Sequence, residues 1–262
     1  MNGQKLKFYN SEQGIPSSVI YDVSQDSRGY IWIATEAGAS YYDGVNFNTF
    51  YCDSNLPGSL KTETVKNIFT DSRETCWVGS INGLQIYDKK KNVFIDFDLQ
   101  YPSFTGTQYV SSIVENKKSG KILVSISGCG ILVYDIFTHE IDMVTTKRLN
   151  RLYDEKYLGV LYFDREGDLW SFSEQGAFYK ADIENYAIEK VNWSPQLLQL
   201  SKHIVVSAIT DIPGGSNILI GTYNHGLYIY DRDLGHVRKI RGAKQKKYRI
   251  RSLLTAQNSI GE

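Results

Sequence analysis

The sequence predicts an all-β fold, a β-propeller of four-stranded blades, on three observations. A phrase of two short strands around a glycine turn occurs five times in 262 residues, as in residues 29–44 and again in residues 74–88. Alternating apolar and polar positions are typical of half-buried strands, and helical periodicity is almost absent. A four-stranded unit of about 45 residues cannot bury both of its faces alone, and radial stacking of such units is the propeller solution.

Three landmarks fix the spacing of the five copies. The first strand of the phrase has a hydrophobic anchor, at Trp32, Trp77, Leu123, Trp170 and Leu219. An aspartate closes the second strand, at Asp43, Asp88, Asp135, Asp182 and Asp231. Between them lies a turn glycine, where the backbone needs a positive φ, at Gly38, Gly83, Gly130, Gly176 and Gly226.

Each copy also has an apolar strand before the phrase and another after it, such as VIYDVSQD and FNTF in the first. The repeats are therefore predicted over residues 18–50, 64–97, 109–144, 157–191 and 204–240. Residues 1–10 and 248–262 read as partial blades, with LKFY as a fourth strand and RIRSLL as a first strand. The pattern thus predicts one partial propeller domain over 1–262, five complete repeats of a truncated, seven-bladed propeller.

The turn SQDSRGYIW is similar to the Asp-box turn of sialidases. We interpret it as a hairpin device, in which Asp26 accepts backbone hydrogen bonds and Trp32 packs between blades. No Trp-Asp dipeptide is present, and the only double glycine is Gly214-Gly215, which argues against the WD-repeat and kelch classes.

Bulk properties exclude several partners. The 29 basic residues balance 29 acidic ones, which gives no global reason to expect nucleic acid or an anionic membrane. No apolar run reaches the roughly 18 residues of a membrane span, and the first five residues contain no signal-peptide core. Cys52, Cys76 and Cys129 lack the spacing of a zinc site or a disulfide framework, and Cys76 is expected to be an inert buried thiol.

With these residues in place, the repeat resembles the two-component regulator propeller family. The resemblance rests on QGIPSSVIYDVSQDSRGYIWIATEAGASYYDGVNFNTF and covers essentially the whole chain, more weakly in the third and fourth repeats. It implies the periplasmic sensor region of a hybrid two-component sensor histidine kinase and response regulator from glycan-degrading bacteria. The kinase itself, its membrane helix and any DNA-binding domain would lie elsewhere in such a protein, and dimerisation is implied only by the resemblance.

Catalytic motifs are missing from the sequence. The four histidines have no metal-ligand spacing, and there is no HExxH, GxSxG or phosphate-binding glycine loop. We therefore expect no enzyme activity, cofactor or metal in this chain. A sialidase-like or lyase-like propeller enzyme and a protein-interaction scaffold stay open as alternatives.

A ligand is expected at the loops that join strand two to strand three and each strand four to the next repeat. The short turns would contribute Glu36, Asn82, Ser127, Glu174, Tyr223, Asn224 and His225. The long connections would contribute Tyr101, Phe104, Tyr109, Arg148, Arg151, Tyr153, Trp193 and His203. Aromatic rings beside polar groups suit a sugar, which predicts a glycan or oligosaccharide, although packing of loops onto the blades explains each residue singly.

The segment KIRGAKQKKYRIR, residues 239–251, holds seven basic residues and no acid. We interpret it as a solvated loop between blades, and if it binds anything, a uronic or sulfated glycan suits a sensor better than DNA does.

Overall fold

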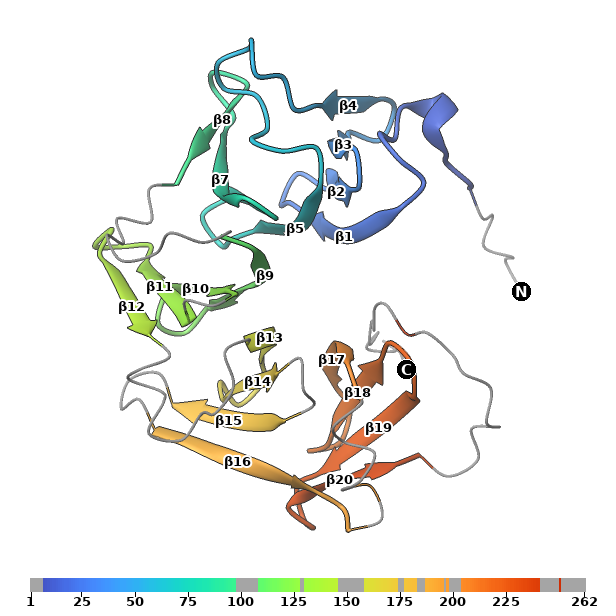
Figure 1. Cartoon of the computed structure of the whole chain (residues 1–262), viewed down its shortest axis with the longest axis vertical. Coiled ribbons are helices and arrows are strands. Elements are labelled where there is room, and N and C mark those ends of the chain that lie inside the picture. Colours follow the sequence, from blue (N-terminus) through green and yellow to red (C-terminus); the bar gives the residue numbers. More distant parts are fainter. Residues whose placement is uncertain are drawn as a thin grey trace, which may run out of the picture. The chain divides into compact units, whose positions relative to one another are not determined.

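The computed structural model describes residues 7–97, 108–127, 130–145, 158–173, 177–182, 187–195, 197, 204–240 and 250. Within them the strands form three four-stranded sheets and one eight-stranded sheet, and the single short helix is a 3-10 turn at Ser11–Gln13. The chain divides into two compact units, residues 1–115 and 116–262 (Figure 1). The all-β prediction is confirmed.

The first unit contains two consecutive antiparallel sheets. The first is β1 (Ile20–Gln25), β2 (Ile31–Thr35), β3 (Gly38–Tyr42) and β4 (Phe47–Phe50), paired in chain order. The second is β5 (Val65–Thr70), β6 (Cys76–Ser80), β7 (Gly83–Asp88) and β8 (Val93–Asp96), in the same order. Both sheets follow the predicted pattern of four strands in each repeat.

The remaining strands repeat the same antiparallel order. The third sheet is β9 (Val110–Asn116), β10 (Lys121–Ile126), β11 (Gly130–Asp135) and β12 (Ile141–Thr145). The fourth set is β13 (Leu158–Phe163), β14 (Leu169–Ser173), β15 (Phe178–Asp182) and β16 (Ala187–Trp193). The fifth set is β17 (Val206–Asp211), β18 (Ile218–Thr222), β19 (Gly226–Asp231) and β20 (His236–Lys239).

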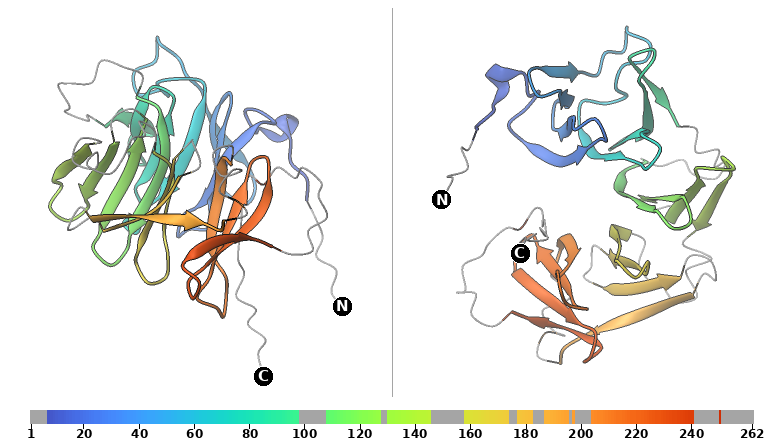
Figure 2. Two further views of the ribbon diagram at one scale, coloured as in Figure 1. Left: turned by 60° about the horizontal axis from the view of Figure 1, so that its bottom comes forward. Right: turned by 180° about the vertical axis from the view of Figure 1, so that it is seen from behind.

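The fourth and fifth sets join into one sheet, which the sequence does not predict. β16 has seven residues, and its pairing with β15 ends at Val191. The overhanging Asn192 and Trp193 pair in parallel with His236 and Val237 of β20 (Figure 2). The extra length of β16 is therefore what connects the two sets.

The tryptophan anchors are buried. Trp32 and Trp170 are fully buried, and Trp77 is 1% exposed. In the first unit Trp32 packs with Val65, Ile68 and Tyr87, which come from the second sheet. The predicted packing of the anchor tryptophan between sheets is confirmed for Trp32.

The turn glycines that the structure describes also lie as expected, with a positive φ at Gly38, Gly83, Gly130 and Gly226. Gly38 has a φ of 127°, and a Cβ there would collide with the carbonyl oxygen of Phe50. Cys76 is fully buried, and burial raises the pKa of its thiol, so it is inert as predicted.

Residues 7–10 differ from the prediction, because they are not in a strand. Phe8 is 87% exposed, and Tyr9 packs against Tyr42 and Phe47 with ring centroids 5.1 and 5.4 Å away. This ring packing positions the segment together with two sets of hydrogen bonds. The Tyr9 hydroxyl donates to that of Tyr42, and Asn10 exchanges bonds with Gln13.

Candidate functional site

The turns between second and third strands are held by a recurring hydroxyl. Thr35 Oγ1 donates to the Gly38 carbonyl at 2.8 Å, and Thr222 Oγ1 donates to that of Gly226 at 2.8 Å. Ser80 makes the equivalent bond in the second sheet. Each turn is thus a fixed platform for the residues at its tip.

The tips carry the predicted ligand residues. Glu36 and Asn82 are exposed in the first unit. In the second unit Tyr223 is 38% exposed, and the Asn224 Oδ1 and His225 Nδ1 atoms lie 2.6 Å apart. These side chains are accessible from loops on rigid sheets, and their role in binding stays a prediction.

The longer connections give a mixed outcome. Tyr109 is half-buried just before β9. Trp193 is 5% exposed and meets Tyr228 edge to face at 5.6 Å, so it is a core residue rather than an exposed platform for a sugar. Further predicted residues lie outside the described part of the chain, namely Tyr101, Phe104, Arg148, Arg151, Tyr153, Glu174 and His203, with Gly176 and most of the basic segment.

In each repeat a hairpin turn joins the first strand to the second, and its aspartate has the expected structural role. Asp71 Oδ1 accepts from the backbone N–H groups of Arg73 and Thr75, and its Oδ2 accepts from Trp77 Nε1 at 2.8 Å. Asp164 makes the same bond to Trp170 Nε1 at 2.7 Å. This arrangement fixes each hairpin turn and the indole beneath it.

In the first and fourth repeats, an arginine also bonds the turn aspartate. Burial opposes ionisation of Asp26, but hydrogen bonds from Arg28 and the Tyr30 backbone lower its pKa below the usual value. Burial likewise opposes ionisation of Asp164, and bonds from Trp170 and Arg232 lower its pKa. Both carboxylates are therefore structural anions rather than proton donors.

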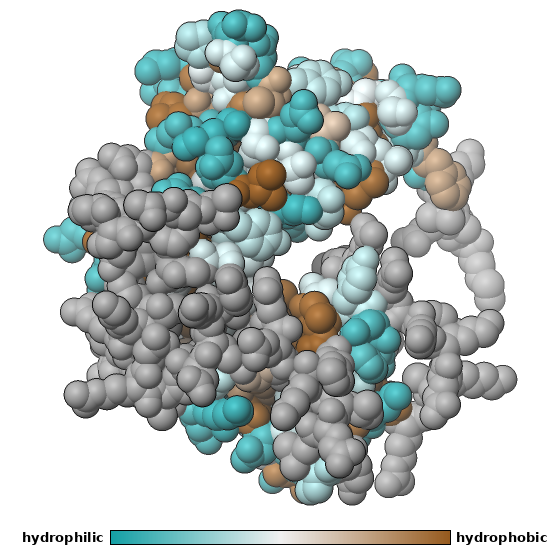
Figure 3. Space-filling view, viewed as in Figure 1, coloured by the Kyte–Doolittle hydropathy of each residue, from teal (hydrophilic) through white to brown (hydrophobic). Residues whose placement is uncertain are grey.

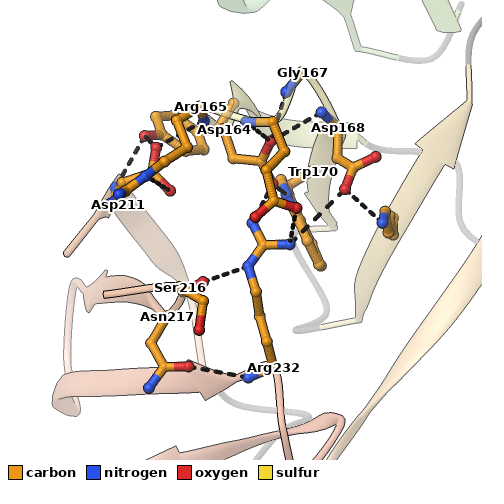
Figure 4. Close-up of polar contacts among 12 residues, drawn as sticks. Asp164, Arg165, Gly167, Asp168, Trp170, Asp211, Ser216, Asn217 and Arg232 are labelled. Carbon is orange, nitrogen blue, oxygen red and sulfur yellow. Dashed lines mark hydrogen bonds and ion pairs between the residues drawn. The ribbon is translucent and has the colours of Figure 1, made fainter. Parts of the chain in front are cut away.

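An acidic cluster in the second unit has the composition of a metal site. The nearest carboxylate oxygens of Asp164, Glu166 and Asp168 lie within 4.8 Å of one another. The Arg232 guanidinium bonds Asp164 and lies 3.0 Å from Glu166, while Lys180 lies 2.5 Å from Asp168 (Figure 4). Two protein cations thus pair with the three carboxylates, an arrangement that we interpret as a latch between β13–β14 and β19–β20.

A cavity of about 400 Å³ opens in the first unit between the first and second sheets. It is lined by Arg28, Tyr41, Asn48, Thr49, Phe50, Tyr87, Lys89 and Asn92. The sequence analysis does not identify this cavity, because its lining comes from the outer strands and from turns at the end opposite Glu36 and Asn82. Alternation along one strand does not reveal which side chains of two sheets face the same space.

Seen as in Figure 1, the first unit shows hydrophilic side chains with apolar ones in isolated spots (Figure 3). His139 and His236 use their ring nitrogens within their own hairpin turns, on the Tyr134 hydroxyl and the Leu234 carbonyl. These two histidines therefore have structural partners.

Comparison with known sequences identifies the repeat. The sequence model of the two-component regulator propeller family matches residues 14–37, which include β1 and β2. No curated protein sequence matches the chain. The resemblance noted from the sequence is therefore confirmed at the first repeat.

Solved structures confirm the fold. The chain superimposes on the extracellular domain of the one-component system BT4673 from B. thetaiotaomicron with a TM-score of 0.68 and 20% identity, covering 92% of this chain and 32% of that one. The extracellular domain of the hybrid two-component system BT3049 from the same organism gives 0.59 and 17%, covering 94% and 38%. Virginiamycin B lyase from Staphylococcus aureus gives 0.63 and 14%, covering 87% and 71%.

The chain therefore has a β-propeller fold and spans about a third of the length of the two extracellular-domain structures. Among the described residues, no helix is long and apolar enough to cross a membrane.

Proposed function

We propose that this chain is part of the ligand-sensing propeller region of a hybrid two-component regulator, located in the periplasm. The observation that carries the proposal is the match of residues 14–37 to the two-component regulator propeller repeat. The likeness to extracellular domains of such systems supports it. Kinase activity would belong to the rest of the same protein, with which this chain would act as a partner.

The proposed ligand is a glycan or an oligosaccharide. Support comes from the exposed polar and aromatic groups at the loop tips, such as Glu36, Asn82 and Tyr223. Sugars need directed hydrogen bonds together with an aromatic surface, and loops on a rigid scaffold can supply both.

A saccharide panel tests this proposal. The 262-residue chain is titrated calorimetrically with oligosaccharides of neutral, uronic and sulfated composition, and each mixture is then analysed for products. We expect saturable binding of at least one oligosaccharide with no change in its length. Absence of binding across the whole panel would overturn the proposed ligand class.

An enzyme is the second candidate, because the structural likeness to virginiamycin B lyase covers 71% of that protein. This alternative requires a new product after incubation with the panel or with a streptogramin B antibiotic. A scaffold function instead requires a protein partner or a second copy of the chain. Light scattering of the purified chain measures the proposed homodimer directly.

A further inference from the structure

The cavity of the first unit lies in a groove that has an occupied counterpart in the second unit. In both units an anchor tryptophan packs against a tyrosine of the next sheet: Trp32 against Tyr87 at 5.0 Å, and Trp170 against Tyr230 at 4.9 Å. In the second unit Arg232 reaches from the turn after β19 into this groove and lies over the Trp170 ring at 5.7 Å. A protein side chain thus fills that groove.

The first unit leaves the same position open. Lys89 follows Asp88 as Arg232 follows Asp231, but its ammonium group lies 3.6 Å from Glu74 rather than on the aspartate of the preceding sheet. Asp26 is bonded instead by Arg28 of its own turn at 2.6 Å. Among the described residues, no side chain of the second sheet bonds Asp26 as Arg232 bonds Asp164. A space of about 400 Å³ is left there, bordered on that side by Tyr87, Lys89 and Asn92.

The lining of this space suits a hydroxyl-rich ligand. The Tyr87 hydroxyl donates to Asn92 Oδ1 at 2.5 Å, which leaves the Asn92 amide nitrogen as a donor. Thr49 Oγ1 donates to the Gly14 carbonyl at 2.5 Å, so its oxygen can accept. With the Tyr41 ring as an apolar wall, the space offers fixed donors, acceptors and an aromatic surface, at a volume within the range of about 300–1,000 Å³ for small-molecule sites.

The charge of the lining favours an acidic ligand among the hydroxyl-rich ones. The lining contains two cations, Arg28 and Lys89, and no carboxylate. Arg28 is held by the buried Asp26, whereas Lys89 has only the partly exposed Glu74, whose side chain is 37% exposed. A partly exposed pair of this kind contributes little to stability, so a ligand carboxylate can replace Glu74 as the partner of Lys89.

We infer that the groove between the first and second sheets binds a sugar unit that carries a carboxylate, a uronate, with Lys89 receiving the carboxylate and Asn48 and Asn92 bonding the hydroxyls. This inference rests on the proposed function, because it gives the sensed glycan a chemical class and a place.

The test is calorimetric titration of the 262-residue chain with D-glucuronate and D-galacturonate. D-glucose and D-galactose test the need for the carboxylate, and acetate tests whether charge alone is enough. Lys89→Gln removes the proposed carboxylate contact, and Lys90→Gln removes the same charge one residue away, at an exposed position outside the cavity lining. Circular dichroism and Tm verify that both variants fold.

We expect a uronate to bind saturably, the neutral sugars and acetate to bind at least tenfold more weakly, and Lys89→Gln to raise Kd by about tenfold or more. Lys90→Gln should leave Kd within twofold. Asn48→Ala, which keeps the charge, should also raise Kd.

Four results would overturn the inference. Equal effects of Lys89→Gln and Lys90→Gln would place uronate binding outside the groove, and acetate binding as tightly as a uronate would reduce it to anion binding. Binding of neutral oligosaccharides but no uronate would refute the groove and leave the proposed function intact. If no saccharide bound at all, both the inference and the proposed function would be overturned.

Discussion

The first pair of four-strand sets, β1–β8, and the last pair, β13–β20, share a frame of three groups but surround it with different side chains. Each has a buried aspartate at a hairpin turn, an anchor tryptophan and a tyrosine from the next sheet. The first pair surrounds this frame with aromatic rings, including Tyr30 and Tyr41, which stack 5.5 Å apart. The last pair has Asp168 and Lys180 in those two places, 2.5 Å apart, and closes the groove with Arg232.

The difference shows that the outer residues of a repeat can vary while its turn is preserved. Tyr41 and Lys180 are the strand partners of Trp32 and Trp170. Tyr30 and Asp168 both donate a backbone N–H to the turn aspartate. Tyr30 and Asp168 use only their backbone N–H groups in these bonds. The side chains at these positions can therefore differ, and they contribute to a cavity in one pair and to an ionic latch in the other.

Removing the turn aspartate of the last pair should have the largest effect. In Asp164→Ala, Trp170 Nε1, the turn N–H groups and the Arg232 guanidinium all lose a buried acceptor. Leaving such groups unpaired costs about 3–5 kcal/mol, which should lower Tm in a calorimetric scan by roughly 6–20 °C.

Asp26→Ala is the matched variant in the first pair. Arg28, the main partner of Asp26, is 45% exposed and can turn to solvent, so we expect a smaller decrease in Tm than for Asp164→Ala. Equal decreases would show that the latch adds nothing to the shared turn.

The latch arginine should have an intermediate effect. Arg232→Gln removes the cation that bridges Asp164, Glu166 and Asp168, while its side chain is only 15% exposed. We expect a loss of about 1–3 kcal/mol in unfolding free energy, measured with urea. Lys89→Gln, at the equivalent place in the first pair, should cost less than about 0.5 kcal/mol because its one ion pair is at the surface.

A loss for Lys89→Gln as large as for Arg232→Gln would contradict the distinction between an open and a latched groove.

Much of the fold could be predicted from the sequence, because the signals are periodic and local. The spacing of Trp32, Trp77 and Trp170, the turn glycines and the role of Asp26 all follow from the chemistry of one repeat. The parallel pairing of β16 with β20 could not be predicted, since it depends on where β15 ends relative to β16.

The candidate site could be predicted less well. The loop residues Glu36 and Asn82 are exposed as expected, but Trp193 is in the core, because its place two residues past the end of the β15 pairing brings it onto β20. The cavity and the latch depend on which side chains of two sheets meet, and residues such as Asn48 and Arg232 carry no signal in the pattern of their own repeats.

The last predicted effect is a pH dependence that belongs to the first pair. Burial raises the pKa of Asp22 to about 6, although the backbone N–H groups of Ile68 and Val23 oppose the increase. Because the folded state favours the protonated carboxyl, this group stabilises the protein fully below about pH 4. That contribution is lost as the pH rises through 6.

Asp22→Asn keeps an acceptor for the Ile68 N–H and has no charge to bury. We expect wild type to lose on the order of 1 kcal/mol relative to Asp22→Asn between pH 4 and 7.5, measured by urea unfolding at each pH. Asp43→Asn serves as the control, since backbone hydrogen bonds from Asn46 and Val45 lower the pKa of Asp43 and leave it ionised throughout that range. A difference between wild type and Asp22→Asn that stays constant from pH 4 to 7.5 would show that Asp22 is ionised in the folded state. The contact between β1 and β5 would then be a permanent charge-assisted bond, like the latch of the last pair.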